Sequence, residues 1–156
     1  TTAEDDLLFC LLHDNRVASP LAQIFDPTWL NLDIPAGRIL AKIMAETKAD
    51  GPVEANRMEE FLEDDLERTA FQHNLFQEVS SFDENSFLQH TNECLLALFI
   101  RSIKQKEKKI LEHLDRPTDG NDSLNSLRIQ LQQLRTNRKN PPKLVFSDQH
   151  TRYSHA

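Results

Sequence analysis

The chain has 156 residues, enough for one domain or for one domain with a small appendage, and for a core that needs no disulfide or metal. Its longest apolar run, residues 94–100, is far shorter than the roughly 20 residues that cross a bilayer. The first residues carry no basic-then-apolar signal segment. We therefore expect a cytoplasmic protein without a membrane partner.

The charge is unevenly distributed along the chain. Residues 1–100 hold 6 Lys and Arg against 19 Asp and Glu, a charge of −13, whereas residues 101–156 hold 12 against 6, a charge of +6. The acidic part would repel a phosphate backbone, so we expect no direct contact with nucleic acid. The basic end would attract an acidic protein surface, or nucleic acid weakly. A solvated helix face followed by a tail explains this basic end equally well.

Helical spacing dominates the sequence and strand-type alternation is nearly absent, which predicts an all-α fold. A first helix is expected over residues 3–14, with Thr2 as its N-cap and Asp5 completing a capping box. A short second helix is expected to have Ser19 as its N-cap and Pro20 at its first position.

The middle of the chain predicts three further helices. Trp29 is expected to turn toward the core before a third helix, which begins near Pro35 and stops before the breaker at residues 50–52. A fourth helix is expected over residues 53–62 and a fifth over residues 64–78. The apolar face of the fifth helix contains Leu66, Ala70, Phe71 and Leu75.

The C-terminal half predicts two more helices. The sixth, capped by Asp83, runs without Gly or Pro to Leu114, about 32 residues or about 48 Å. The seventh covers residues 124–138 and is capped by Asp122 or Ser123. Its leucines form a narrow, coiled-coil-like seam that would face the apolar residues of the sixth helix. These leucines are Leu124, Leu127, Leu131 and Leu134.

The predicted architecture is a helical bundle over residues 1–100 that a long helix extends into a C-terminal helical hairpin over residues 101–139. Beyond this hairpin, residues 140–156 lose the helical pattern. We expect them to form a flexible tail, in which residues 143–146 are the segment able to dock locally.

No residue pattern predicts a catalytic site. Cys10 and Cys94 lie among apolar residues and are interpreted as small core residues that form no disulfide. Because the sequence has no CxxC motif and no Cys–His cluster, we expect neither a metal nor a cofactor. The pair His13-Asp14 lacks the upstream histidine of metal phosphohydrolases, and the acidic stretch of residues 59–67 is interpreted as a solvated surface.

The order and spacing of these helices resemble a known family. Residues 5–16, Asp-Asp-Leu-Leu-Phe-Cys-Leu-Leu-His-Asp-Asn-Arg, are similar to the opening helix of the helicase-binding domain of bacterial DnaG-type primases. Residues 25–30, Phe-Asp-Pro-Thr-Trp-Leu, resemble the family's next landmark, and the helix around residues 39–44 follows it. The long helix, the break after it and the last helix are similar to the family's closing hairpin. The resemblance covers about residues 3–139.

The resemblance implies a bundle and a hairpin that dock on the N-terminal domains of the hexameric replicative helicase. This contact would recruit primase to the replication fork and modulate the helicase. The fragment would be non-catalytic, whereas the parent protein would be a DNA-directed RNA polymerase, a primase. By position, the residues expected to bind the partner are Leu127, Arg128, Leu131, Leu134 and Arg135, supported by Ile110 and Leu114.

Three alternatives remain open. The N-terminal domain of the replicative helicase itself has a similar bundle and hairpin, although a helicase would continue into an ATPase with a phosphate loop. A small α-helical metal-dependent enzyme is a different class, which stoichiometric metal would favour. A helical adaptor with a partner outside replication is the third. The tail beyond Arg138 and the lysine-rich arm of the hairpin depart from the family's usual pattern.

Overall fold

The computed structural model describes residues 2–79, 83–115, 120–146 and 151–154. In chain order, its elements are the helices α1 (Ala3–His13), α2 (Ala18–Ile24), α3 (Pro35–Asp50), α4 (Ala55–Met58), α5 (Asp65–Leu75), α6 (Glu84–Asp115) and α7 (Asn121–Arg138), and the strands β1 (Lys143–Phe146) and β2 (Thr151–Ser154). Short 3-10 helices occupy Asn15–Val17, Pro27–Trp29 and Glu59–Phe61. The predicted all-α fold class is confirmed. Among the described helices, none combines the length and the apolar character needed to cross a membrane.

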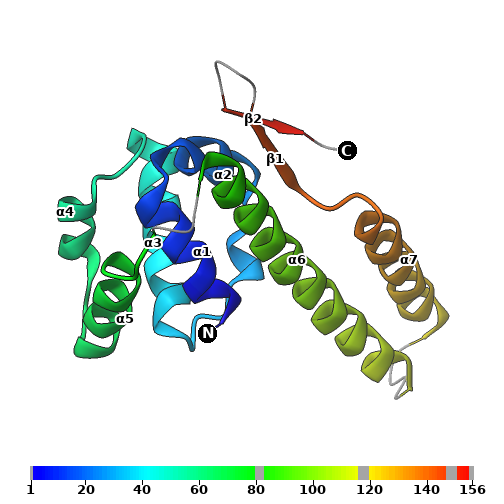
Figure 1. The fold of residues 1–156 in the computed structure, drawn as a ribbon. Coiled ribbons are helices and arrows are strands. Elements are labelled where there is room, and N and C mark those ends of the chain that lie inside the picture. The colour runs from blue at the N-terminus through cyan, green and yellow to red at the C-terminus, as the bar shows by residue number, and fades with distance from the viewer. Residues whose placement is uncertain (1, 80–82, 116–119, 147–150, 155–156) are drawn as a thin grey trace.

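Figure 1 shows a helical bundle from which one long helix projects. Within the bundle, α1 packs against α3, α5 and α6, and α2 packs on α3. The second half of α6 leaves the bundle, and α7 returns along it as the other arm of a hairpin. One continuous helix therefore belongs to both the bundle and the hairpin.

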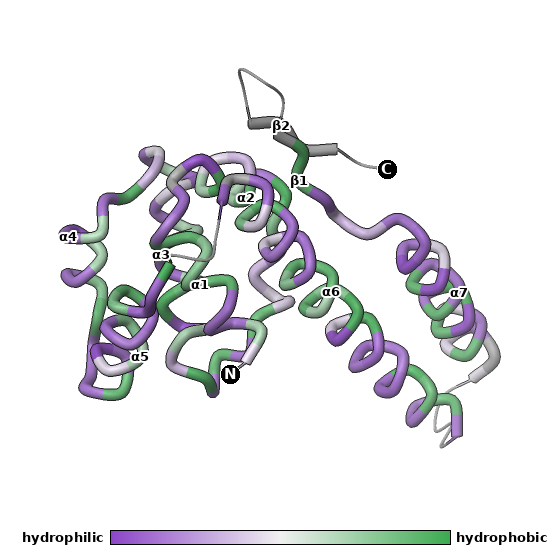
Figure 2. The backbone as a smooth tube through the Cα atoms, viewed as in Figure 1, coloured by the Kyte–Doolittle hydropathy of each residue, from purple (hydrophilic) through white to green (hydrophobic). Residues whose placement is uncertain are grey.

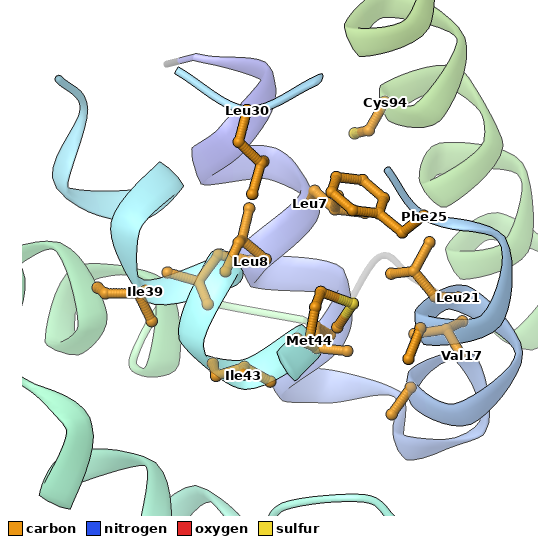
Figure 3. Close-up of a cluster of buried hydrophobic side chains, with 14 of the residues drawn as sticks. Leu7, Leu8, Val17, Leu21, Phe25, Leu30, Ile39, Ile43, Met44 and Cys94 are labelled. Carbon is orange, nitrogen blue, oxygen red and sulfur yellow. The ribbon is translucent and has the colours of Figure 1, made fainter. Parts of the chain in front are cut away.

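The hydrophobic core gathers around α1. Leu7 and Leu8 of α1 are fully buried and belong to one cluster with Ile39 and Ile43 of α3. Figure 3 shows these side chains converging, with Cys94 entering the cluster from α6. Burial of each large aliphatic side chain stabilises the fold by about 1.5–3 kcal/mol. The bundle thus supplies a rigid base for the hairpin.

Of the two N-caps predicted for the first two helices, one is correct and the other is wrong. At α1, the Asp5 N–H donates to Thr2 Oγ1 at 3.1 Å, and the Thr2 hydroxyl donates to Asp5 Oδ2 at 2.7 Å, so the predicted cap is confirmed. The predicted Ser19 cap is wrong, because α2 begins at Ala18 and encloses Ser19 in its first turn. The preceding 3-10 turn runs directly into α2, and Val17 at the junction is fully buried. Burial of Val17, not a side-chain cap, sets where α2 begins.

The fourth and fifth helices are shorter than predicted, and one residue of the predicted apolar face of the fifth helix points away from the core. Leu66 is 66% exposed, so the prediction that it faces inward is wrong. Glu67 takes the inward position, where Lys42 Nζ donates to it at 2.8 Å and Arg38 Nε at 3.1 Å. Because a buried carboxylate needs such partners, this ion-paired cluster fixes the rotation of α5. Glu67 therefore departs from the solvated surface expected of this acidic stretch.

The segment after the hairpin is not a simple tail. Strands β1 and β2 pair in antiparallel fashion, and Leu144 of β1 is fully buried against the bundle. The Leu144 N–H donates to Asn92 Oδ1 at 2.8 Å, and Asn92 Nδ2 donates to the Leu144 carbonyl oxygen at 2.9 Å. β1 coincides with residues 143–146, the segment of the tail that was expected to be able to dock locally, and one side chain of α6 satisfies both backbone groups of Leu144. Residues 147–150 and 155–156 of the expected tail lie outside the described residues.

Candidate functional site

The two arms of the hairpin are held together by apolar side chains that lie between them. Ile110 of α6 and Leu131 of α7 are both buried. Leu127 and Leu134, about one turn to either side of Leu131, are half-buried. The leucine seam of α7 therefore lies against α6, and its outer members keep part of their apolar surface accessible.

Beside this seam lies a groove of about 520 Å³ between α6 and α7. Its apolar lining consists of Ile110, Leu127 and Leu134. Its polar lining consists of Lys106, Lys109, His113, Gln130, Gln133 and Asn137. Figure 2 shows hydrophobic and hydrophilic positions mixed along both arms. The groove thus combines apolar side chains with polar, partly basic ones.

A second hollow of about 310 Å³ lies where the hairpin leaves the bundle. Trp29 and Phe99 contribute aromatic lining, with their ring centroids 5.6 Å apart in an edge-to-face arrangement. The two hollows share Lys106, Leu134 and Asn137, so the groove continues toward the bundle. We refer to the two hollows together as the trough.

The structure brings three of the seven residues predicted to bind a partner into the trough: Ile110, Leu127 and Leu134. Leu131 is buried between the arms and acts as a packing residue of the hairpin. Leu114 is half-buried near the end of α6, and Arg128 and Arg135 are exposed on α7. None of these four is among the trough's lining residues.

Two aromatic residues of the trough were not associated with a site in the sequence. Trp29 was expected to turn toward the core, and it is only half-buried. Its neighbour Phe99 lies in the first half of α6, where the apolar spacing predicts core packing alone. The two rings meet because the 3-10 turn Pro27–Trp29 packs on α6, and this contact between distant segments is not visible in the sequence.

A second group of chemically capable side chains lies where α1 packs on α6. Asp6, His90 and Cys94 each offer one donor atom, and these atoms all lie within 4.8 Å of one another. Cys10 lies one turn after Asp6 and outside this group of three, and its neighbour Cys94 lowers the pKa of the Cys10 thiol. The sequence held a signal for this group, because Asp6–Cys10 and His90–Cys94 are each spaced by four residues. It did not show that the two pairs face each other.

Both cysteines are buried free thiols, as predicted. The neighbouring Cys94 thiol lowers the pKa of the Cys10 thiol, because a proton directed at the Cys10 sulfur would stabilise its thiolate. The neighbouring Cys10 raises the pKa of the Cys94 thiol, and burial raises it further.

His13 and Asp14, the pair compared with metal phosphohydrolases in the sequence, make structural contacts. His13 Nε2 donates to the Asn74 carbonyl oxygen at 2.9 Å, which ties the end of α1 to α5. Asp14 accepts from Arg16 Nη2 at 2.7 Å and from the Arg16 backbone N–H at 3.1 Å. His13 is the last residue of α1 and Asp14 is its C-cap, so these contacts close the helix.

Compared with known proteins, the chain matches no family model, no curated protein and no solved structure. The class is therefore defined by the fold alone. The chain is an all-α protein in which a helical bundle and a projecting hairpin share one long helix.

Proposed function

We propose that this chain is the helicase-binding domain of a bacterial replicative primase. It docks on the N-terminal domains of the hexameric replicative helicase, brings the primase to the replication fork and modulates the helicase. The parent protein is then a DNA-directed RNA polymerase of the cytoplasm, and this part of it is non-catalytic. The order of its helices supports the proposal, and the trough on the hairpin carries it.

The trough has the composition of a protein-binding surface. Its centre is apolar, with Leu127 and Leu134 half-buried, and exposed lysines flank it. Protein interfaces combine an apolar centre with a polar rim, and aromatic side chains are enriched in them. Trp29 extends this pattern to the base of the hairpin. An apolar side chain of the partner would fill the trough.

The charge of the hairpin indicates the sign of the partner surface. Lys106 and Lys109 line the trough and are exposed, and Arg128 and Arg135 are exposed on the other arm. Opposite charges speed association and exclude wrong partners more than they add affinity. We therefore expect an acidic rim around the apolar contact on the helicase.

The experiment that tests this function is size-exclusion chromatography with light scattering. The 156-residue chain is mixed with the replicative helicase of its own source, each at about 50 µM, where even weak specific complexes are populated. A co-eluting complex that weakens with added salt is expected. If both proteins are folded and no complex forms, the proposed function is wrong.

Charge variants on one helix locate the contact. Lys106→Glu with Lys109→Glu reverses two trough lysines and is expected to weaken the complex at least about tenfold. Lys104→Glu with Lys108→Glu makes the same charge change at exposed positions of the same arm that do not line the trough. This control pair is expected to bind like the unchanged chain. Equal losses in both pairs would contradict the trough as the contact.

Apolar variants on α7 provide the second comparison. Leu127→Asp places a carboxylate in the trough and is expected to abolish binding, whereas Ile129→Asp, at a position that is 59% exposed and outside the trough, is expected to retain it. Leu131→Asp is expected to open the hairpin, because Leu131 is buried between the arms. Circular dichroism separates loss of folding from loss of binding. A folded Leu127→Asp chain that still binds would contradict the contact assignment.

A further inference from the structure

The contact between α1 and α6 brings together two pairs of potential metal ligands. Asp6 and Cys10 lie one turn apart on α1, and His90 and Cys94 lie one turn apart on α6. Residues spaced by four share one face of a helix, so each helix presents two donors to the other. The donor atoms of Asp6, His90 and Cys94 all lie within 4.8 Å of one another, and Cys10, which is buried one turn after Asp6, is the next cysteine on this face of α1.

The donor atoms are spaced for a small ion. Zinc bonds to sulfur at about 2.3 Å and to nitrogen or oxygen at about 2.0–2.2 Å, so donors around a tetrahedral zinc lie roughly 3.2–3.8 Å apart. The three donors within 4.8 Å need to close by only about 1 Å, a movement that side-chain rotations on two packed helices can provide. Cys10 lies outside this group of three, so its side chain would also have to turn toward the ion to become a fourth ligand.

The surroundings suit a closed site with limited access to solvent. Cys10 is fully buried and Cys94 nearly so, whereas Asp6 and His90 are half-buried and leave a path for an ion. Glu93 Oε2 lies 3.8 Å from His90 Nδ1, too far for a hydrogen bond, and a side-chain rotation of Glu93 would bring it within reach of the imidazole ring. A carboxylate beside a ligating histidine is the usual support of a zinc site.

We propose that Asp6, Cys10, His90 and Cys94 form a four-ligand Zn²⁺ site that joins α1 to α6. Two thiolates with an imidazole and a carboxylate favour Zn²⁺ over Mg²⁺ and Ca²⁺, which prefer oxygen ligands. Four protein ligands leave no position open for a substrate, so the site is structural. It is independent of the proposed function, because none of its four residues lines the trough.

Binding of the ion is balanced by the release of protons. The Cys10 and Cys94 thiols each lose one proton as their sulfur bonds to zinc, while Asp6 binds as a carboxylate and His90 as a neutral imidazole. Two protons therefore leave to solvent for each ion bound, and no electron is transferred. Zinc affinity is expected to fall as the pH is lowered.

The test uses Co²⁺ as a spectroscopic probe, followed by Zn²⁺. The 156-residue chain is stripped of metal with a chelator, kept reduced with a phosphine so that Cys10 and Cys94 cannot form a disulfide, and titrated with Co²⁺. Thiolate-to-cobalt charge-transfer absorption and the intense visible bands of tetrahedral cobalt are expected at one equivalent. Zn²⁺ should displace the cobalt and raise Tm by at least about 5 °C. A reduced, folded chain without cobalt–thiolate absorption would overturn the proposal.

Variants assign the ligands. Cys94→Ala and the nearly isosteric Asp6→Asn are each expected to weaken zinc binding at least about tenfold, and Cys10→Ser to do the same. His73→Ala, an exposed histidine of α5 outside the cluster, is the control and should bind zinc like the unchanged chain. Circular dichroism of the metal-free chains verifies folding. Unchanged zinc affinity in folded Asp6→Asn or Cys10→Ser would show that the four-ligand assignment is wrong.

Discussion

Glu4 of α1 and Arg101 of α6 form an ion pair between the start of the bundle and the start of the hairpin. Arg101 Nη1 lies 2.7 Å from Glu4 Oε1, and Arg101 Nη2 donates to Glu4 Oε2 at 3.2 Å and to the Trp29 carbonyl oxygen at 3.1 Å. The Glu4 side chain is fully buried, whereas Arg101 is partly exposed. The pair thus anchors α6 at the point where it leaves the bundle.

Removal of Arg101 is expected to destabilise the fold. In Arg101→Met the buried Glu4 carboxylate loses its cationic partner, which costs about 3 kcal/mol in the free energy of unfolding. Because the double variant Glu4→Gln with Arg101→Met leaves no unpaired charge, it should recover most of this loss. Urea denaturation followed by circular dichroism measures both values. A double variant as unstable as Arg101→Met would show that the unpaired charge is not the cause.

The ion-paired cluster around Glu67 predicts a pH dependence of stability. Burial raises the pKa of Glu67, but the hydrogen bonds from Lys42 and Arg38 outweigh it and hold the pKa below the ordinary value of 4.5. A carboxyl with a lowered pKa in the folded state contributes stability above its unfolded pKa, and this contribution is lost as the pH falls. The free energy of unfolding should therefore decrease as the pH drops below about 4.5, and Glu67→Gln should flatten this decrease.

Urea midpoints measured from about pH 7 to about pH 3 test the Glu67 prediction. Glu59→Gln removes an exposed carboxyl of the same acidic stretch and serves as the control, which should keep the acid-side loss of stability. Identical slopes for Glu67→Gln and the unchanged chain would contradict the assignment.

A methyl group at Gly37 has no room. A Cβ atom on Gly37 would lie 2.1 Å from the Asn31 carbonyl oxygen, a backbone atom that cannot rotate away. Gly37→Ala is therefore expected to destabilise the chain by about 2 kcal/mol, because α3 must shift away from the preceding turn. Gly120→Ala is the control, since nothing lies within 4 Å of its added Cβ. Thermal unfolding of the two variants should show a lowered Tm for Gly37→Ala alone.

Asn92 is expected to control the docking of β1. Asn92→Ala removes the acceptor for the Leu144 N–H and the donor for its carbonyl, at a cost of about 1–3 kcal/mol. Hydrogen exchange should then show the Leu144 amide losing its protection while the amides of the core helices keep theirs. Asn92→Asp retains an acceptor and should give intermediate protection. Full protection in Asn92→Ala would mean that burial of Leu144 alone holds the strand.

Elements marked by local signals could be predicted from the sequence. Asp83 caps α6 by accepting from the Ser86 N–H at 2.8 Å, and the absence of Gly and Pro lets the helix continue to Asp115. Pro35 opens α3 as predicted, and Gly51 follows its end with a φ of +89°. Caps and breakers act within a few residues, so their effects need no knowledge of the tertiary fold.

Features that depend on contacts between distant segments could not be predicted. The inward rotation of Glu67 requires Lys42 and Arg38 of another helix, and the docking of Leu144 requires Asn92. The hairpin shows the same limit: the seam could be predicted, but the burial of Leu131 depends on how α7 crosses α6. Likewise, Asp6, His90 and Cys94 come together only because α1 and α6 pack against each other at that point.

The continuity of α6 has a thermodynamic consequence for any partner that binds the hairpin. α6 is one unbroken helix of 32 residues, and Arg101 anchors it to Glu4. The part of α6 that carries Ile110 therefore has no flexible hinge between it and the bundle. Hinged modules lose conformational entropy when a partner immobilises them, and that loss weakens association. In this chain, folding itself already fixes the position of the hairpin, so binding a partner costs little further conformational entropy in the hairpin.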